Sequence, residues 1–373
     1  IDFFEQAIDV NWCKCTLASN EVYKMTIARK NLVDLSVTRF YHCISKCVRS
    51  LFLMGDDRIE GGVDRKAWIE HRLQFLSEVF AISIASYSVL DNHLHTVLRV
   101  DLEKANAWTA TEVARRWLRL HPPRDKKRKP IEITEAYLEK ICRDSDWVED
   151  IRGRLRSIGW FMKLVKEPLA RLANKEENCP GTFFEARFKS IAILDEAALL
   201  AVCVYVDLNP VAAGIAQTPE ESPYTSIKER VDHVKRRGEL KKLLACEQGG
   251  VASRSLSISL ELDQWLIPVD DQRSIDSERK GLIEGLTLGN YLKLVEQTGR
   301  KDRAGKIAIS PDLEDIFDRL GITDSRWQDQ MDRLSGGKLV GSYVAGSRER
   351  LREVAAKLGV RHLVNLYAVT DPA

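Results

Sequence analysis

The stretch ISIASYSVLDNHLHTVLRV, residues 82–100, decides the fold. Its first part, 82–90, alternates at a period of two, which predicts a strand. Asp91 and Asn92 form a two-residue turn signal, and 93–100 has the pattern of a returning strand. The stretch therefore predicts a β-hairpin, and the flanking segments are interpreted around it.

Two further segments are expected to complete the sheet. Residues 37–46 (VTRFYHCISK) and 187–194 (RFKSIAIL) are rich in β-branched and aromatic residues, which favours strands. Between the first of them and the hairpin, Asp64 is expected to cap a helix that runs to about Phe80, because apolar residues recur there at helical spacing.

Two more helices follow from apolar spacing and capping residues. From Ile151 to Leu172 the apolar residues step by four and three, which predicts one helix across the whole stretch. After the last strand, Asp195 is expected to cap a helix that continues through Tyr205 and stops at Pro210.

The predicted order of elements is β-α-β-β-α-β-α, which indicates an α+β fold. Its first six elements match the ferredoxin-like arrangement, an antiparallel sheet with helices on one face. We expect this domain over residues 25–225, with a basic insertion at about 101–146. Residues 1–24 are interpreted as an N-terminal extension, and 226–373 as a mostly helical C-terminal domain.

The composition is that of an ordinary globular protein. The chain has 373 residues, 44% of them apolar, and a net charge of only +2, so any basic surface must be local. No apolar run reaches the ~18–20 residues of a membrane span. The eight cysteines include no C-x-x-C pair, which argues against a structural zinc site. We expect a protein of the reducing cytoplasm that does not associate with membranes.

His93 and His95 are the first candidates for chemistry. Residues two apart on a strand point to the same face of a sheet, so the two imidazoles could chelate one cation. A histidine pair at this spacing is also common by chance, and a surface or packed pair is the alternative. The spacing alone does not choose between them.

Tyr205 and Asn209 are the second candidates. Four residues apart on the predicted helix, they share one face about one turn apart. A tyrosine hydroxyl is a nucleophile only when activated, because its ordinary pKa is about 10. An amide oxygen beside it could complete a metal site, whereas the alternative is a half-buried tyrosine and an asparagine that caps the helix before Pro210.

The order of these pairs along the chain resembles that of a known family. The segment YSVLDNHLHTVLRV (87–100) resembles the histidine–hydrophobic–histidine strand of single-tyrosine transposases in the HUH endonuclease superfamily. The segment YVDLNPVAAGIAQTPEESPYTSI (205–227) resembles the tyrosine helix of the REP-associated tyrosine transposases. GTFFEARFKSIAILDE (181–196), TIARKNLVDLSVTRFYHCISKCVRS (26–50) and LGNYLKLVEQTGRKDRAGKIAI (288–309) resemble further parts of that family. The ordered set HLH, RFKS and YVDLNP is the specific part of the likeness.

The resemblance, over roughly Met25 to Leu363, implies a role for each candidate. His93 and His95 would be metal ligands, Asn209 the third protein ligand and Tyr205 the nucleophile. The implied ion is Mg²⁺ or Mn²⁺. Two imidazoles and an amide are softer ligands than the all-oxygen shell that magnesium prefers, so Mn²⁺ should bind well. The implied activity is nicking and strand transfer of single-stranded or hairpin DNA through a 5′-phosphotyrosine.

Basic side chains are the expected DNA contacts. Residues 111–130 carry eight Lys or Arg and two acidic residues, so this stretch could follow a phosphate backbone or could be a solvated loop. On the first strand, Arg39 and His42 should point to opposite faces, so at most one of them faces the site. The expected DNA-binding residues are Arg39, Arg115, Arg116, Arg124, Lys126, Lys127, Arg128, Lys129, Arg187 and Lys189.

Three functions are weighed. Besides the transposase, the chain could be a catalytically inactive, domesticated nucleic-acid-binding protein, or a metal-dependent phosphohydrolase that uses water and needs no tyrosine. The intact set of His93, His95, Tyr205 and Asn209 argues against loss of catalysis. The resemblance also implies a bacterial cytoplasmic protein, nucleoid-associated when bound to DNA. It does not decide between a monomer and a homodimer.

Overall fold

The computed structural model describes residues 33–55, 61–216, 218–245, 250–271, 279–301 and 344–357. The expected N-terminal extension, 1–24, lies outside these described residues. The strands are β1 (Phe40–Lys46), β2 (Ile82–Val89), β3 (His93–Val100), β4 (Lys189–Ile193) and β5 (Val344–Ala345). The α-helices are α2 (Arg65–Val79), α3 (Leu102–Ala107), α4 (Ala110–Leu120), α5 (Glu135–Cys142), α6 (Ser145–Leu155), α7 (Ile158–Glu176), α8 (Glu196–Ala212), α9 (Ser226–Arg236), α10 (Leu240–Ala245), α11 (Gly250–Leu260), α12 (Leu288–Lys301) and α15 (Arg348–Lys357).

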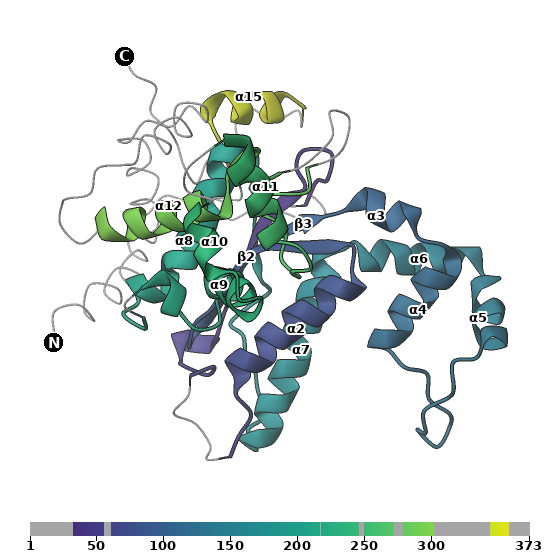
Figure 1. The fold of residues 1–373 in the computed structure, drawn as a ribbon. Coiled ribbons are helices and arrows are strands. Elements are labelled where there is room, and N and C mark those ends of the chain that lie inside the picture. The colour runs from purple at the N-terminus through teal and green to yellow at the C-terminus, as the bar shows by residue number, and fades with distance from the viewer. Residues whose placement is uncertain are drawn as a thin grey trace.

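The sheet confirms an α+β fold (Figure 1). Its strand order is β2-β3-β1-β4-β5, and the first four strands pair antiparallel. The short β5 adds to β4 in parallel. The central strand β1 therefore comes first in the chain and lies between the hairpin and the last strand of the predicted unit.

The predicted hairpin is confirmed. β2 and β3 pair along their length, and the backbone N–H of Leu90 donates to the oxygen of His93 at 2.9 Å, which closes the turn. The predicted cap is also present before α2, where the side chain of Asp64 accepts a hydrogen bond from the backbone N–H of Ala67. Local signals were sufficient here because turn and cap chemistry act within a few residues.

Helices cover both faces of the sheet: α2 and α7, the helices of the predicted six-element unit, lie on one face as expected, and α8, which follows that unit, covers the other. On one face, Tyr41 and Leu98 pack in a core with α2 and α7, which lie side by side (Figure 1). On the other face, Phe40 and Val97 pack in a second core with α8. α8 can fill this position because nearly all of its residues are apolar, so it is buried on most sides.

The stretch from Ile151 to Leu172, predicted as one helix, is two helices. α6 ends at Leu155 and α7 begins at Ile158. Ser157 between them is extended, and its side chain accepts a hydrogen bond from the backbone N–H of Trp160. The apolar spacing continues across the break because both helices pack into the same core.

Pro210 does not stop α8, which again differs from the prediction. The helix continues to Ala212, and Gly214 follows with a φ of 71°. A proline removes one backbone N–H from the helix, and here that loss falls in the last turn. Because the helix passes through position 210, Asn209 is held in regular helical geometry.

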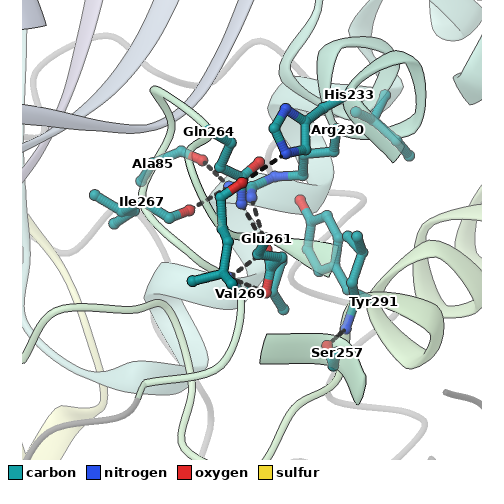
Figure 2. Close-up of polar contacts among 12 residues, drawn as sticks. Ala85, Arg230, His233, Ser257, Glu261, Gln264, Ile267, Val269 and Tyr291 are labelled. Carbon is teal, nitrogen blue, oxygen red and sulfur yellow. Dashed lines mark hydrogen bonds and ion pairs between the residues drawn. The ribbon is translucent and has the colours of Figure 1, made fainter. Parts of the chain in front are cut away.

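Of the helices after α8, α12 packs against α8 and α9 packs against β2. Tyr291 on α12 belongs to the same core as α8. The buried guanidinium of Arg230 on α9 donates to the backbone oxygens of Ala85 and Ile267 at 3.0 and 2.8 Å and lies 3.1 Å from Glu261 (Figure 2). A boundary between two domains near residue 225 stays a prediction.

Candidate active site

The sheet register places three histidines on the face that α8 covers. His93 and His95 alternate with Leu94 on β3 and so share a face. On the neighbouring β1, His42 lies opposite Val97, and Lys46 lies opposite His93. Directly paired residues of antiparallel strands share a face, so His42 joins the two predicted ligands. Of Arg39 and His42, the histidine is the residue beside this cluster.

Tyr205 and Asn209 reach this face from α8. The helix starts at the predicted cap, since the side chain of Asp195 accepts a hydrogen bond from the backbone N–H of Ala198. The ring of Tyr205 lies edge-on to that of His95, with centroids 5.7 Å apart. The side chain of Asn209 is close enough to both His93 and Tyr205 to shift their pKa values. The structure thus brings together all four residues that the sequence singled out as ligands and nucleophile.

The two predicted ligands are held in the same way. Nδ1 of His93 lies 2.5 Å from Oδ1 of Asn92, and Nδ1 of His95 lies 2.9 Å from Nε2 of His42. When Nδ1 of an imidazole donates its proton to a neighbour, Nε2 is left with the lone pair that a metal ion needs. The donor set of two imidazole nitrogens and one amide oxygen fits a divalent ion of intermediate softness.

Three buried polar atoms without a hydrogen-bond partner lie at this site, and others lie elsewhere in the described residues. Those at the site are Nδ1 of His42, Oγ of Ser88 and Nδ2 of Asn209, all shielded from solvent. Ser88 on β2 lies opposite His95. Each such atom costs about 1–3 kcal/mol of stability, so several of them together indicate a place built for a ligand or water rather than for packing.

The electrostatics favour neutral imidazoles. Burial lowers the pKa of His42 to about 3, and the charge of Lys189 acts in the same direction. Burial and Lys46 likewise lower the pKa of His93 to about 4, and burial holds the pKa of His95 well below its usual value. A neutral imidazole is the form that ligates metals.

The phenol of Tyr205 is not yet activated in the chain alone. Burial raises its pKa, and the neighbouring side chain of Asn209 lowers it. The hydroxyl therefore keeps its proton at neutral pH until positive charge is brought close to it. Lys189, whose charge acts on His42, has a pKa of about 8 because burial and Lys46 depress it.

The basic insertion lies away from this site. α4 packs on the side of the sheet that α2 and α7 cover, and α4, α5 and α6 gather at the end of the molecule away from α12 (Figure 1). Two of the expected DNA contacts in the insertion are engaged in ion pairs, Arg115 with Glu135 and Arg116 with Glu112 at 2.8 Å.

The remaining expected DNA contacts are divided between loop and strand. The loop between α4 and α5 exposes Arg124, Lys126, Lys127, Arg128 and Lys129. Arg187 is exposed just before β4, Arg39 is half-buried just before β1, and Lys189 alone lies on the site's face, opposite Ile44. All ten stay predictions as DNA contacts.

Sequence reasoning missed Asn92 and Ser88 as members of the site, and it left open whether Arg39 or His42 faces it. The available signal for His42 was the alternation of Phe40, His42 and Ile44 along the first strand, which places a histidine on an otherwise apolar face. Using that signal requires the register between β1 and β3, and the sequence does not supply it.

Comparisons with known proteins find no relative of this chain. No protein-family model matches the chain, and no curated protein or solved structure is similar to it. Within the described ranges, no helix is both long and apolar enough to cross a membrane. Over the same ranges, no three His, Cys, Asp or Glu side chains form a group that could hold a metal ion, so the candidate site depends on the amide of Asn209 as well as the imidazoles.

Proposed function

We propose that the chain is a metal-dependent single-strand DNA endonuclease and strand transferase, a transposase that acts through a 5′-phosphotyrosine on hairpin or palindromic DNA. The observation that carries this proposal is the convergence of two imidazoles, a phenol and a carboxamide from β3 and α8. The strand order β2-β3-β1-β4, all antiparallel, supports a ferredoxin-like core as part of the proposal.

The proposed reaction exchanges one phosphodiester for another. Oη of Tyr205 attacks the phosphorus and gives up its proton, the bond from phosphorus to the 3′ oxygen breaks, and that oxygen takes up a proton. The products are a 5′-phosphotyrosine and a free 3′-OH. Because the phosphodiester bond energy is retained, another 3′-OH can reverse the step, which completes strand transfer without ATP.

His93, His95 and Asn209 would hold a divalent ion, Mg²⁺ or Mn²⁺, which would supply Lewis-acid withdrawal of charge from the phosphate. Asn209 would have a second task, since its side chain lowers the pKa of the neighbouring Tyr205. Tyr205 and the histidines come from one chain, so the proposal includes that they act within one subunit. The setting is the cytoplasm, with the chain on the nucleoid when bound to DNA.

The test is the formation of a covalent adduct. A labelled single-stranded hairpin oligonucleotide is incubated with the chain and Mn²⁺ and then separated on a denaturing gel. We expect a protein–DNA adduct that is lost in Tyr205→Phe and on removal of the ion with EDTA. Tyr137→Phe is the matched control, because Tyr137 is a half-buried tyrosine on α5 in the insertion.

Other outcomes identify the competing functions. Cleavage that is the same in Tyr205→Phe would point to a phosphohydrolase that uses water. Binding without cleavage would point to an inactive nucleic-acid-binding protein. Either result would overturn the proposed function.

A further inference from the structure

His42 is a third imidazole in the site, and its contact with His95 is specific. Its side chain is fully buried on β1, and its Nε2 lies 2.9 Å from Nδ1 of His95. The two rings are stacked, with centroids 5.1 Å apart and planes at 24°. His42 therefore contacts the edge of His95 that carries Nδ1.

The direction of this hydrogen bond decides what His95 can do. A neutral imidazole carries one proton, on either Nδ1 or Nε2. If His95 donates from Nδ1 to His42, its Nε2 keeps a lone pair. If His42 donates instead, the proton of His95 must lie on Nε2, and no lone pair is left there for an ion.

We infer that His42 is a positioning residue that fixes His95 in the tautomer with the proton on Nδ1 and sets the plane of its ring. The inference rests on the proposed function, because it assigns a task to His42 within that metal site. Asn92 plays the same part for His93, since its Oδ1 lies 2.5 Å from Nδ1 of that ring. Outer partners of this kind orient ligands and raise their basicity.

The unpartnered Nδ1 of His42 is compatible with either direction of the bond, since it would carry an unpaired proton in one case and an unpaired lone pair in the other. When His42 accepts at Nε2, its own proton lies on Nδ1, which is buried and has no partner in the structure. Keeping a buried polar atom unpaired costs stability, so packing alone does not explain a histidine at this position. Holding His95 in the tautomer that can ligate a metal ion explains it.

The test measures ion affinity and the tautomer rather than activity. Mn²⁺ alone, without DNA, is titrated into the full chain, and free Mn²⁺ is followed by electron paramagnetic resonance. His42→Phe removes the acceptor, and we expect affinity to fall by about 10–100-fold, the usual effect of losing such a partner. His42→Gln places an amide oxygen near the position of Nε2 and should restore most of the affinity.

Phe40→Leu is the matched control for packing. Phe40 lies two residues before His42 on the same strand and face and belongs to the core below α8. We expect Mn²⁺ affinity to stay within about threefold of the unsubstituted chain, since no partner of an imidazole is removed. In parallel, ¹⁵N chemical shifts of the unsubstituted chain should show the proton of His95 on Nδ1.

Two results would overturn the inference: His42→Phe binding Mn²⁺ as tightly as the unsubstituted chain, or a His95 spectrum with the proton on Nε2. If His42→Phe does not fold, His42→Gln and the spectrum of the unsubstituted chain still decide. A chain that shows the expected Mn²⁺ pattern but no tyrosine adduct would refute the proposed function and leave the role of His42 standing.

Discussion

Two buried polar clusters contact opposite sides of α8, and they are built differently. The histidine cluster comprises His42, His93, His95, Tyr205 and Asn209. The anchor network comprises Asp207, Ser226, Arg230, Glu261 and Tyr291. Residues two positions apart on an α-helix, such as Tyr205 and Asp207, are separated by about 200° around the helix axis. Asp207 therefore points away from the side that carries Tyr205.

The anchor network is richly hydrogen-bonded. Asp207 accepts from the hydroxyl of Ser226, from the backbone N–H of Ile227 at 3.1 Å and from the hydroxyl of Tyr291 at 2.6 Å. The charge of Arg230 is paired with Glu261, and both side chains are almost fully buried (Figure 2). The network joins β2, α8, α9 and α12.

The histidine cluster lacks this completeness. Its unpartnered atoms, on His42 and Asn209, lie beside imidazoles whose Nδ1 atoms are already engaged. The difference teaches that burial alone does not distinguish a structural polar group from a functional one. In these two clusters the difference lies in the completeness of hydrogen bonding, and a buried polar atom without a partner calls for an explanation such as a ligand or water.

The largest expected effect is on stability, from Arg230→Met. The substitution leaves Glu261 without its cation, and the backbone oxygens of Ala85 and Ile267 lose their donor. Breaking a buried pair in this way costs about 3–5 kcal/mol. Urea unfolding followed by circular dichroism measures it.

The matched control for that prediction is Arg171→Met. Arg171 pairs with Glu167 at 2.9 Å, but its side chain is 71% exposed, so the loss should stay below about 1 kcal/mol. Equal losses for the two arginines would show that the anchor network is not a structural unit.

A second prediction compares two buried serines, Ser226 in the anchor network and Ser88 beside the histidine cluster. Both Ser226 and Ser88 are 0% exposed. The hydroxyl of Ser226 contacts Asp207 and accepts from the backbone N–H of Tyr87 at 3.0 Å, whereas Oγ of Ser88 has no partner. Ser226→Ala should cost about 1–3 kcal/mol, whereas Ser88→Ala should cause no loss and should raise stability by up to about 1–3 kcal/mol, because it removes a buried hydroxyl without a partner.

Thermal melts of both variants at one pH make this comparison. A large loss in Ser88→Ala would mean that this hydroxyl is a structural group after all. The proposed difference in hydrogen bonding between the anchor network and the histidine cluster would then fail for the pair of serines that compares them most directly.

Local patterns in the sequence predicted much of the fold but little of the anchor network. The hairpin, and the caps at Asp64 and Asp195, depend on residues a few positions apart, and all were predicted. The break at Ser157 was missed because the apolar spacing continues across it. The contact between Asp207 and Tyr291 spans 84 positions, and no periodicity announces it.

The same distinction between local patterns and long-range contacts explains which parts of the candidate site could be predicted from the sequence. Spacing of two on a strand and four on a helix placed His93 with His95 and Tyr205 with Asn209. That these two pairs meet, and that His42 joins them, follows only from the strand register and the packing of α8. The assignment of chemistry to them came from resemblance and stays a proposal.

The smallest expected effect concerns DNA binding and its pH dependence at Lys189. Burial and the neighbouring charge of Lys46 hold the pKa of Lys189 at about 8. A lysine with a lowered pKa is charged below that value and loses its charge as the pH rises through it. If DNA lies on this face, its affinity should therefore fall by about 2–10-fold between pH 7 and pH 9.

Lys189→Arg sharpens this prediction, because a guanidinium stays charged across the whole range. Fluorescence anisotropy with a labelled single strand, in the Tyr205→Phe background and at constant ionic strength, should show affinity falling with pH for lysine but not for arginine. Lys127→Arg is the control, since Lys127 is exposed on the loop between α4 and α5. The same pH slope for lysine and arginine at position 189 would place the DNA elsewhere, and the histidine cluster would lose its expected anionic ligand.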